Sequence, residues 1–234
     1  MAKTVLVTGV SSGIGHAQAR LFLEQGYEVY GVDVAGEENL LPYPAFHFLQ
    51  LDLRGSLAPL FDWLPAVDIL CNTAGKLDAY KPLLDVSEEE IEDILAVNVL
   101  AAMRLTRFYL VRMLEKKAGI IINMCSIASF LAGGGGVAYT ASKHALAGFT
   151  KQLALDYADQ GIQVFGLAPG AVKTAMTASD FEEGGLADWV AAETPIKRWL
   201  EPEEIAEVSL FLASGKAASM QGEIVKIDGG WSLK

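Results

Sequence analysis

The sequence predicts one doubly wound α/β domain, with about seven parallel strands in a single sheet and helices on both faces. Short runs of β-branched and apolar residues alternate with longer stretches of helical periodicity, which is the pattern of consecutive βαβ units. A glycine-rich turn joins the first such run to the first helical stretch. The 234 residues contain no linker, repeat or low-complexity segment. We therefore assign residues 1–234 to a single domain.

The elements follow in order along the chain. The expected strands are residues 3–8, 27–34, 46–51, 67–72, 119–125, 162–167 and 223–227. The expected helices are residues 14–25, 87–117, 137–159 and 202–214. Ser87 and Glu90 have the spacing of a capping box at the start of the second helix. Residues 35–46 contain two prolines and a glycine and are too short for a full crossover helix, so we expect a loop or a single turn there.

The charge balance excludes several classes of partner. The chain carries 18 basic and 29 acidic residues, a net charge of −11. This argues against nucleic acid and against anionic lipid as partners, because both need a basic surface. No signal peptide is recognisable at the N-terminus, and no apolar run approaches the ~20 residues of a membrane span. We expect a cytoplasmic protein that uses neither membrane nor nucleic acid.

Cysteine and histidine offer no metal or disulfide framework. Cys71 and Cys125 lie in apolar runs, and we expect both to be buried and reduced. The three histidines have no spacing typical of metal ligands. No metal site is predicted.

The first strand ends in a glycine-rich loop that is followed at once by a helix. Glycines at positions 9, 13 and 15 let the backbone turn sharply and let a pyrophosphate approach the free amides of the helix N-terminus. Asp33 ends the second strand, where a carboxylate accepts hydrogen bonds from the adenosine ribose and repels a 2′-phosphate. No basic residue is adjacent to Asp33 in the sequence, so NAD(H) is favoured over NADP(H). An alternative is a tight turn and a solvated carboxylate without a ligand.

At this point the sequence resembles the short-chain dehydrogenase/reductase family, whose members have a Rossmann fold. The resemblance covers the whole chain and rests on motifs in matching order: T-G-x3-G-x-G from Thr8, N-T-A-G from Asn72, Asn98, Ser126, Y-x-x-x-K from Tyr139, P-G-x-x-x-T from Pro169, and D-G-G from Asp228. Thr73 is an insertion relative to N-A-G, and Cys71 stands where asparagine is common. The overall pattern is most similar to the 3-oxoacyl-[acyl-carrier-protein] reductase branch.

The resemblance implies a set of site residues. The implied catalytic residues are Ser126, Tyr139, Lys143 and Asn98. The implied cofactor-binding residues are Thr8, Gly9, Ser11, Ser12, Gly13, Ile14, Gly15, Asp33, Asp52, Leu53, Asn72, Ala74, Gly75, Tyr139, Lys143, Pro169, Gly170, Val172 and Thr174. By the same resemblance, Asn98 positions a water that links Lys143 to solvent.

Tyr139 and Lys143 are four residues apart on one helix and therefore share a face. A tyrosine with its ordinary pKa of roughly 10 is a poor base at neutral pH. Lowering this pKa to about 7 requires roughly 4 kcal/mol, of which an ammonium about 5 Å away supplies on the order of 3 kcal/mol at an effective dielectric of ~20. A positively charged oxidised nicotinamide would add the rest. In ketone reduction Tyr139 would protonate the developing alkoxide, while Ser126 holds the carbonyl oxygen.

Substrate recognition is expected from residues 175–195, predicted to form a lid, and from the loop between Ser126 and Tyr139. Both are largely apolar, which favours a ketone or alcohol with an apolar body, either free or bound to a carrier. Two alternatives stay open. Asp33 and the short 35–46 segment also suit an NAD-dependent cyclic diol dehydrogenase similar to 2,3-dihydro-2,3-dihydroxybenzoate dehydrogenase. The second alternative is a non-catalytic dinucleotide-binding sensor, which would have the same fold but would not need Ser126, Tyr139 and Lys143.

Two of the expected helices carry features that suggest protein partners. Gly148 lies in the middle of the helix through which family members pair, so we expect a homotetramer or homodimer. Basic residues recur along the end of the second helix, as a solvated face or as a docking site for an acidic carrier; they are Arg104, Arg107, Arg112, Lys116 and Lys117.

Overall fold

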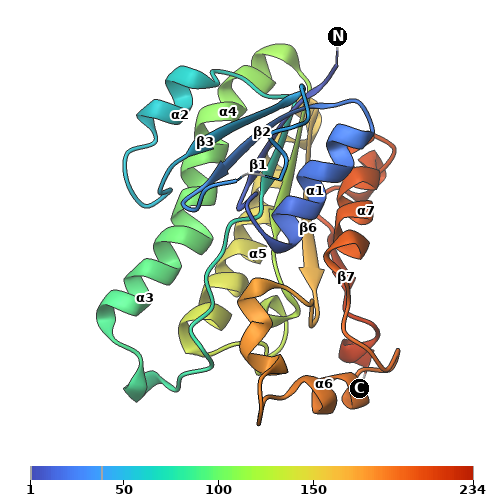
Figure 1. Cartoon of the computed structure of the whole chain (residues 1–234). Helices are drawn as coiled ribbons and strands as arrows, with labels where there is room; N and C mark the ends of the chain where they lie inside the picture. Colours follow the sequence, from blue (N-terminus) through green and yellow to red (C-terminus); the bar gives the residue numbers. More distant parts are fainter. Residues whose placement is uncertain (1, 38, 234) are drawn as a thin grey trace.

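A seven-stranded parallel sheet forms the centre of the protein in the computed structural model, which describes residues 2–37 and 39–233 (Figure 1). The strands are β1 (Thr4–Thr8), β2 (Glu28–Asp33), β3 (Phe46–Gln50), β4 (Ile69–Asn72), β5 (Gly119–Met124), β6 (Ile162–Pro169) and β7 (Ile224–Ile227). Their order across the sheet is β3-β2-β1-β4-β5-β6-β7. The order runs outward in both directions from β1 and β4, as in a doubly wound sheet. The predicted fold class is confirmed.

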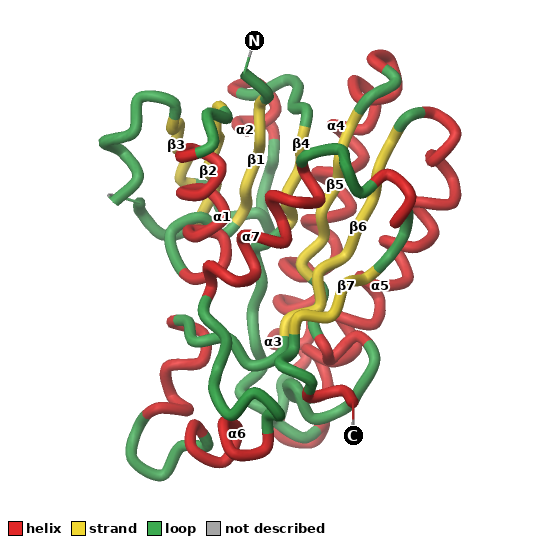
Figure 2. The backbone as a smooth tube through the Cα atoms, turned by 90° about the vertical axis from the view of Figure 1, so that its right-hand side faces the viewer, coloured by secondary structure: helices red, strands yellow, loops and turns green. Residues whose placement is uncertain are grey.

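Helices cover both faces of the sheet (Figures 1 and 2). On one face α1 (Gly13–Glu24) packs against α7 (Pro202–Ala213). The other face carries α2 (Ala58–Trp63), α4 (Ala102–Lys116) and α5 (Val137–Tyr157). Each face has its own apolar core, and β4 shows why: Ile69 and Cys71 point into one core while Leu70 points into the other. Because both faces are covered, the central strands β4 and β5 are buried at every position.

The predicted helix at 87–117 is one continuous but irregular rod. It consists of α3 (Glu88–Leu95), a π-helical segment (Ala96–Ala101) and α4. The Ser87–Glu90 capping box is present, with Glu90 N–H donating to Ser87 Oγ at 3.1 Å. Asn98 lies in the π-helical segment. Such segments occur frequently at functional sites.

Two short helices were missed by the sequence analysis. In α2, Leu57, Leu60 and Leu64 are buried against the sheet, so tertiary packing stabilises a helix too short to show a clear period. The helix α6 (Ala187–Glu193) lies in the predicted lid, and none of its residues is buried. Residues 35–37 and 39–45 form turns and loop, as expected; residue 38 lies outside the described residues.

The expectation that no apolar run approaches the length of a membrane span needs correction. The rod Glu88–Lys116 has 29 residues, and its most apolar window has a mean hydropathy of 1.5, so it is long and apolar enough to cross a membrane. Half of that window is buried inside the protein. This is the burial of a helix that packs on a sheet, and a core helix passes the same test of length and composition.

The carboxyl ends of the parallel strands meet at one edge of the sheet. The glycine loop after β1, the N-T-A-G segment after β4, Ser126 after β5 and Pro169 at the end of β6 are therefore neighbours. This edge is where ligands bind in open α/β sheets.

Candidate active site

A cavity of about 630 Å³ opens at the carboxyl edge of the sheet. It is lined from one end to the other by three groups: the glycine loop with Asp33, the triplet Ser126, Tyr139 and Lys143, and the predicted lid. Most of the predicted cofactor-binding residues line it, namely Gly9, Ser12, Gly13, Ile14, Gly15, Asp33, Asp52, Leu53, Ala74, Gly75, Pro169, Gly170, Val172 and Thr174.

The glycine loop leaves no room for side chains. Gly9 has φ +74°, and a Cβ there would lie 2.9 Å from the Cα of Ala74. A Cβ on Gly15 would lie 2.1 Å from the carbonyl oxygen of Gly9. These contacts bring the loop backbone close to the start of α1, the geometry that lets amides face a phosphate. A dinucleotide of the NAD(P) type fits this cradle.

The ribose end of the cradle carries a fixed carboxylate. Asp33 accepts hydrogen bonds from the backbone N–H groups of Ser11 and Ala35, each at 3.0 Å. A basic residue that was not predicted, Arg54, also lines the cavity at this end. It follows β3 and is therefore not adjacent to Asp33 in the sequence. Its guanidinium is engaged by Asp52 and Asp93, each at 2.7 Å. These two carboxylates offset the charge that Arg54 brings to this end.

Tyr139 lies in the first turn of α5 and is buried. Ser126 follows β5, and its Oγ accepts the N–H of Ala128 at 3.1 Å, which fixes the hydroxyl side chain at the strand end. Burial raises the pKa of the Tyr139 phenol above its ordinary value, and a hydrogen bond with the Ser126 side chain acts in the opposite direction. The predicted pair of hydroxyls is therefore formed.

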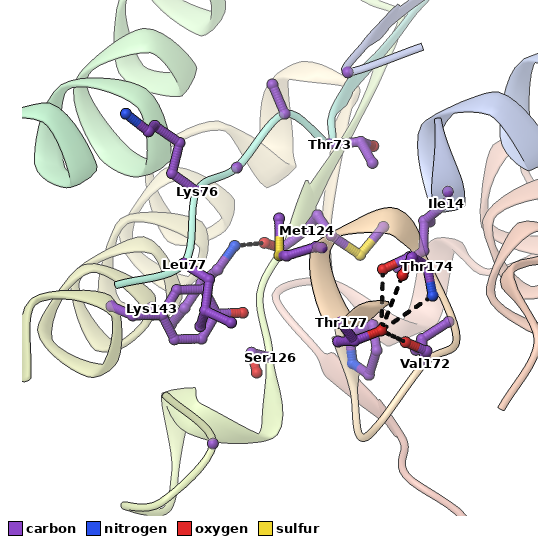
Figure 3. Close-up of a pocket in the computed structure, with 18 of the residues that line it drawn as sticks. Ile14, Thr73, Lys76, Leu77, Met124, Ser126, Lys143, Val172, Thr174 and Thr177 are labelled. Atoms are coloured by element: carbon purple, nitrogen blue, oxygen red, sulfur yellow. Dashed lines mark hydrogen bonds between the residues drawn. The ribbon is translucent and has the colours of Figure 1, made fainter. Parts of the chain in front are cut away.

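Lys143 lies one turn further along α5 and is also buried. Its Nζ donates to the carbonyl of Met124 at 2.7 Å and lies 5.4 Å from the centre of the Tyr139 ring (Figure 3). Burial lowers the pKa of Lys143 to about 8.

Among the protein groups, burial has the largest effect on the pKa of Tyr139 and raises it, opposite to the direction expected from Lys143. Desolvation is the largest influence on both side chains, and it acts against both charged forms. The Coulomb argument from the sequence included the attraction between the two charges but left out the cost of burying them.

Asn98 holds the loop beside Lys143. Its Nδ2 donates to Lys76 O at 3.0 Å and to Ser142 Oγ at 2.9 Å, while its Oδ1 accepts from Lys76 N–H at 2.8 Å. A Cβ on Gly75 would lie 3.4 Å from Asn98 Oδ1 and 3.7 Å from Lys143 Nζ, so both side chains face the same glycine.

The segment after β6 closes the far side of the cavity. Thr177 donates through Oγ1 to the carbonyl of Val172 at 2.8 Å, and it accepts from Thr174 N–H at 3.1 Å (Figure 3). Thr174 in turn lies over Gly13, with its methyl 3.0 Å from the position of a Cβ. This packing joins the start of the predicted lid, residues 175–195, to the glycine loop.

Three predicted cofactor residues do not line the cavity. Thr8 Oγ1 accepts the N–H groups of Thr73 and Ala74, each at 3.0 Å, and so holds the loop after β4. Ser11 fixes Asp33 through its backbone. Asn72 is buried and donates to Asn123 Oδ1 at 2.8 Å, because the alternation along β4 turns its side chain into the helix layer. Their roles toward a cofactor are indirect.

Four residues around the cavity were missed besides Arg54. Asp78 is buried and accepts the backbone N–H groups of Gly136 at 2.6 Å and Tyr139 at 2.9 Å, which caps the start of α5. Tyr80, Trp199 and Trp231 line the cavity. The sequence around Asp78 has no pattern of its own. Its position between the N-T-A-G motif and the next helix is the single signal that could have marked it.

No group of three or more metal-ligating side chains occurs among residues 2–37 and 39–233. Both cysteines, Cys71 and Cys125, are buried and free.

The whole constellation matches one family of known proteins. Residues 9–232 match the family model described as enoyl-(acyl carrier protein) reductase. A 3-oxoacyl-[acyl-carrier-protein] reductase of Vibrio cholerae is 34% identical over 238 residues, covering 97% of this chain and 96% of the relative. The chain belongs to the short-chain dehydrogenase/reductase family. It is therefore an oxidoreductase with the dinucleotide-binding fold of that family.

Solved structures of this family superpose on nearly the whole chain. A 4-hydroxyisoleucine dehydrogenase complexed with NADH has a TM-score of 0.93, 33% identity and 99% coverage of both chains. A protein assigned as an NAD(P)-dependent gluconate 5-dehydrogenase from Beutenbergia cavernae, with NADP at low occupancy, has a TM-score of 0.92 and 33% identity, covering 100% of this chain and 98% of its own. The family thus includes similar proteins with either dinucleotide.

Proposed function

We propose that this short-chain dehydrogenase/reductase interconverts a secondary alcohol and a ketone, with NAD(H) as the preferred cofactor. One observation carries the proposal: Ser126, Tyr139 and Lys143 line the same cavity as the glycine cradle and Asp33. A bound nicotinamide would donate or accept the hydride. The chain's own residues would handle the oxygen and its proton.

In the reductive direction the Tyr139 phenol donates its proton to the substrate oxygen as negative charge develops there. The Ser126 hydroxyl donates a hydrogen bond to the same oxygen. The buried Lys143 ammonium stabilises the phenolate that remains, and its ordinary role in the family is to hold the nicotinamide ribose. Because burial raises the pKa of Tyr139, the phenol stays protonated, which is the form that donates a proton in reduction.

The preference for NAD(H) is supported by the position of Asp33. Its carboxylate is held by two backbone N–H groups at the ribose end of the cradle, and a 2′-phosphate there would meet a like charge. Arg54, the basic residue near this end, already pairs with Asp52 and Asp93. We expect Asp33→Ala combined with Val34→Arg to shift the ratio of kcat/KM for NAD(H) over NADP(H) toward NADP(H) by at least ~10-fold. An unchanged ratio would contradict the role of Asp33.

We further propose that the substrate is a small free molecule rather than a carrier-bound thioester of the 3-oxoacyl-[acyl-carrier-protein] reductase type. The basic strip of α4 ends at Lys116, which pairs with Asp68 just before β4 begins. That end of the strip lies at the amino edge of the sheet, opposite the cavity. A carrier bound at that end would not reach Tyr139 with its thioester. The other end, Arg104, lies beside the cavity, and its guanidinium already donates to the backbone carbonyls of residues 53–55.

An assembly of two or four copies in the cytoplasm is also proposed. Five large apolar side chains are exposed on the helical rod and α5: Leu100, Met103, Val111, Val137 and Leu155. Gly148 on α5 has open space around it, which leaves room for close approach of a second helix. Both features support the assembly through α4 and α5.

Turnover measurements test the main proposal. NADH and NADPH are compared for reduction of an acetoacetyl thioester and a diketone, and NAD⁺ for oxidation of a cyclic diol. We expect Tyr139→Phe to lower kcat about 10³-fold, since it removes the acid/base group, with the NADH Kd within twofold of wild type. Tyr157→Phe, at the other end of the same helix, is the matched control.

Each outcome has a defined reading. Turnover unchanged in the Tyr139→Phe variant contradicts the assigned acid/base. Turnover of the thioester but not of the free ketone or diol overturns the choice of a free substrate. Tight NADH binding without turnover of any substrate favours the non-catalytic sensor.

A further inference from the structure

The substrate end of the cavity is apolar with one conspicuous exception. Its lining there includes Leu77, Met176, Leu186, Trp189 and Val190. Asp180 lies among them and is 9% exposed. Within residues 2–37 and 39–233 its carboxylate has no hydrogen-bond or ion-pair partner. Its oxygens keep access to solvent in the cavity, but a substrate that filled the cavity and offered them no partner would impose the cost of desolvating a charge.

Tyr80 brings a second polar group to the same place. It lines the cavity, and its phenol is close enough to Asp180 for the carboxylate to contribute to raising its pKa, after the larger effect of burial. Like Asp180, the Tyr80 hydroxyl has no hydrogen-bond partner among the described residues. Tyr80 is 46% exposed, so its hydroxyl, like the Asp180 carboxylate, is open to a ligand in the cavity that both residues line.

The backbone holds Tyr80 in this position at some cost. Ala79 and Tyr80 have φ of 51° and 59°, in the left-handed region that side chains other than glycine rarely adopt. The preceding residue, Asp78, is fixed to the start of α5 by the N–H groups of Gly136 and Tyr139. Strain of this kind persists where surrounding contacts enforce it, and it concentrates at functional sites. The position of Tyr80 is thus coupled to the helix that carries Tyr139.

Asp180 is held by a glycine turn. Gly184 has φ +82°, and a Cβ on Gly185 would lie 2.2 Å from the carbonyl oxygen of Asp180. Gly185 N–H donates to Glu182 O at 2.9 Å and closes the turn. Gly185 therefore packs directly against Asp180 and sets its backbone position.

We propose that Asp180 and Tyr80 bind a second polar group of the substrate, a hydroxyl or ammonium that donates a hydrogen bond to the Asp180 carboxylate. This inference rests on the proposed function and deepens it by naming the substrate class. The substrate carries its reacting alcohol or ketone at Tyr139, an apolar body along the cavity, and a donor group at Asp180. Diols, hydroxyketones and amino alcohols meet this description. An unsubstituted acyl chain would leave the carboxylate buried without a partner.

Binding to the NADH complex tests this without requiring turnover. The probes are cyclohexanol, the 1,2-, 1,3- and 1,4-cyclohexanediols, and trans-4-aminocyclohexanol, titrated against the NADH fluorescence of the loaded protein. We expect at least one diol or the amino alcohol to bind wild type ≥ ~10-fold tighter than cyclohexanol, as for hydrogen bonds to a charged group. Asp180→Asn should abolish this preference and leave cyclohexanol within about twofold. Tyr80→Phe should reduce the preference by a smaller factor.

Asp188→Asn is the matched control, because it makes the same change at an exposed lid residue that does not line the cavity. A preference for diols assigns the donor as a hydroxyl, and a preference confined to the amino alcohol assigns it as an ammonium. The inference is overturned if wild type shows no preference for any donor-bearing probe, or if Asp180→Asn retains the preference. Failure of the proposed function is seen separately, as absence of NAD⁺ reduction with every probe.

Discussion

Two walls of one cavity differ sharply in how they are built. The start of α5 with Ser126 is buried, and Asp78, Ser126 and Lys143 all have hydrogen-bond partners there. Opposite it, residues 175–195 expose large apolar side chains: Met176 is 46% exposed, Phe181 43%, Leu186 50% and Trp189 56%. The helix α6 within this wall buries none of its residues.

This difference separates the acid/base chemistry, on the α5 wall, from substrate specificity, on the lid wall. Acid/base groups must be held within a fraction of an ångström, so the wall of α5 is closely packed and enforced by hydrogen bonds. The lid wall has few buried contacts, the property of segments that open locally at low free-energy cost. Exposed apolar groups beside a cavity are also the surface that an apolar substrate would cover. We therefore expect substitutions on the two walls to affect different quantities.

The first test of this difference places a methyl group in the close-packed wall of α5. A Cβ on Gly136 would lie 2.6 Å from the Asp78 carboxylate, which is held in place by two N–H groups. We expect Gly136→Ala to lower the free energy of unfolding by about 2–3 kcal/mol and to lower kcat, because the cap of α5 must shift. Urea denaturation measures the first effect and steady-state kinetics the second.

Gly36→Ala is the control, since a Cβ there meets nothing within 4 Å and the residue lies outside the two helices proposed to form the assembly. It should change the free energy of unfolding by less than ~0.5 kcal/mol. Equal stability of the two variants would contradict the close packing at Gly136.

The second prediction uses the buried ammonium of the same wall. Burial lowers the pKa of Lys143 from 10.5 to about 8. Below pH 8 the lysine is protonated in both the folded and the unfolded chain, and the folded state bears the full cost of the buried charge. Between pH 8 and the ordinary pKa the folded state releases the proton first, so this cost diminishes as pH rises.

The stability of wild type should therefore rise relative to Lys143→Met by about 2 kcal/mol between pH 7 and pH 9.5. Urea midpoints of the two proteins at both pH values measure this difference. Lys151→Met, at a lysine further along α5, should show no such change with pH. A constant gap between wild type and Lys143→Met would contradict the lowered pKa.

The smallest effect on stability is expected in the lid. Leu186 lines the cavity but is half exposed, so Leu186→Ala should change the free energy of unfolding by less than ~0.5 kcal/mol. It should raise KM for an apolar substrate several-fold while kcat stays within about twofold. Leu84→Ala, at a side chain that is 97% exposed and does not line the cavity, should change neither. A large loss of stability in Leu186→Ala would remove the distinction between the two walls.

The sequence was informative wherever structure is set by local chemistry. Short apolar runs between helical stretches predicted every strand, within one or two residues, because strand formation follows the local run of β-branched and apolar residues. The glycines of the cradle and the Y-x-x-x-K spacing marked the two ends of the site for the same reason: turn geometry and helical register act over a few residues. The short helix α2 escaped because its stability comes from Leu60 and its neighbours packing on the sheet.

What the sequence by itself determined was the parallel α/β fold, the family, and the residues that carry acid/base chemistry and line the dinucleotide cradle. Tertiary structure alone decided the balance of forces at those residues. It shows that burial disfavours the charged forms of both Tyr139 and Lys143, and that Asn72 faces the core rather than the cavity. It also brings Asp78, Tyr80 and Asp180, from distant parts of the chain, to the catalytic helix and its cavity. Burial and through-space contact depend on the packing of the whole chain, and no local pattern encodes them.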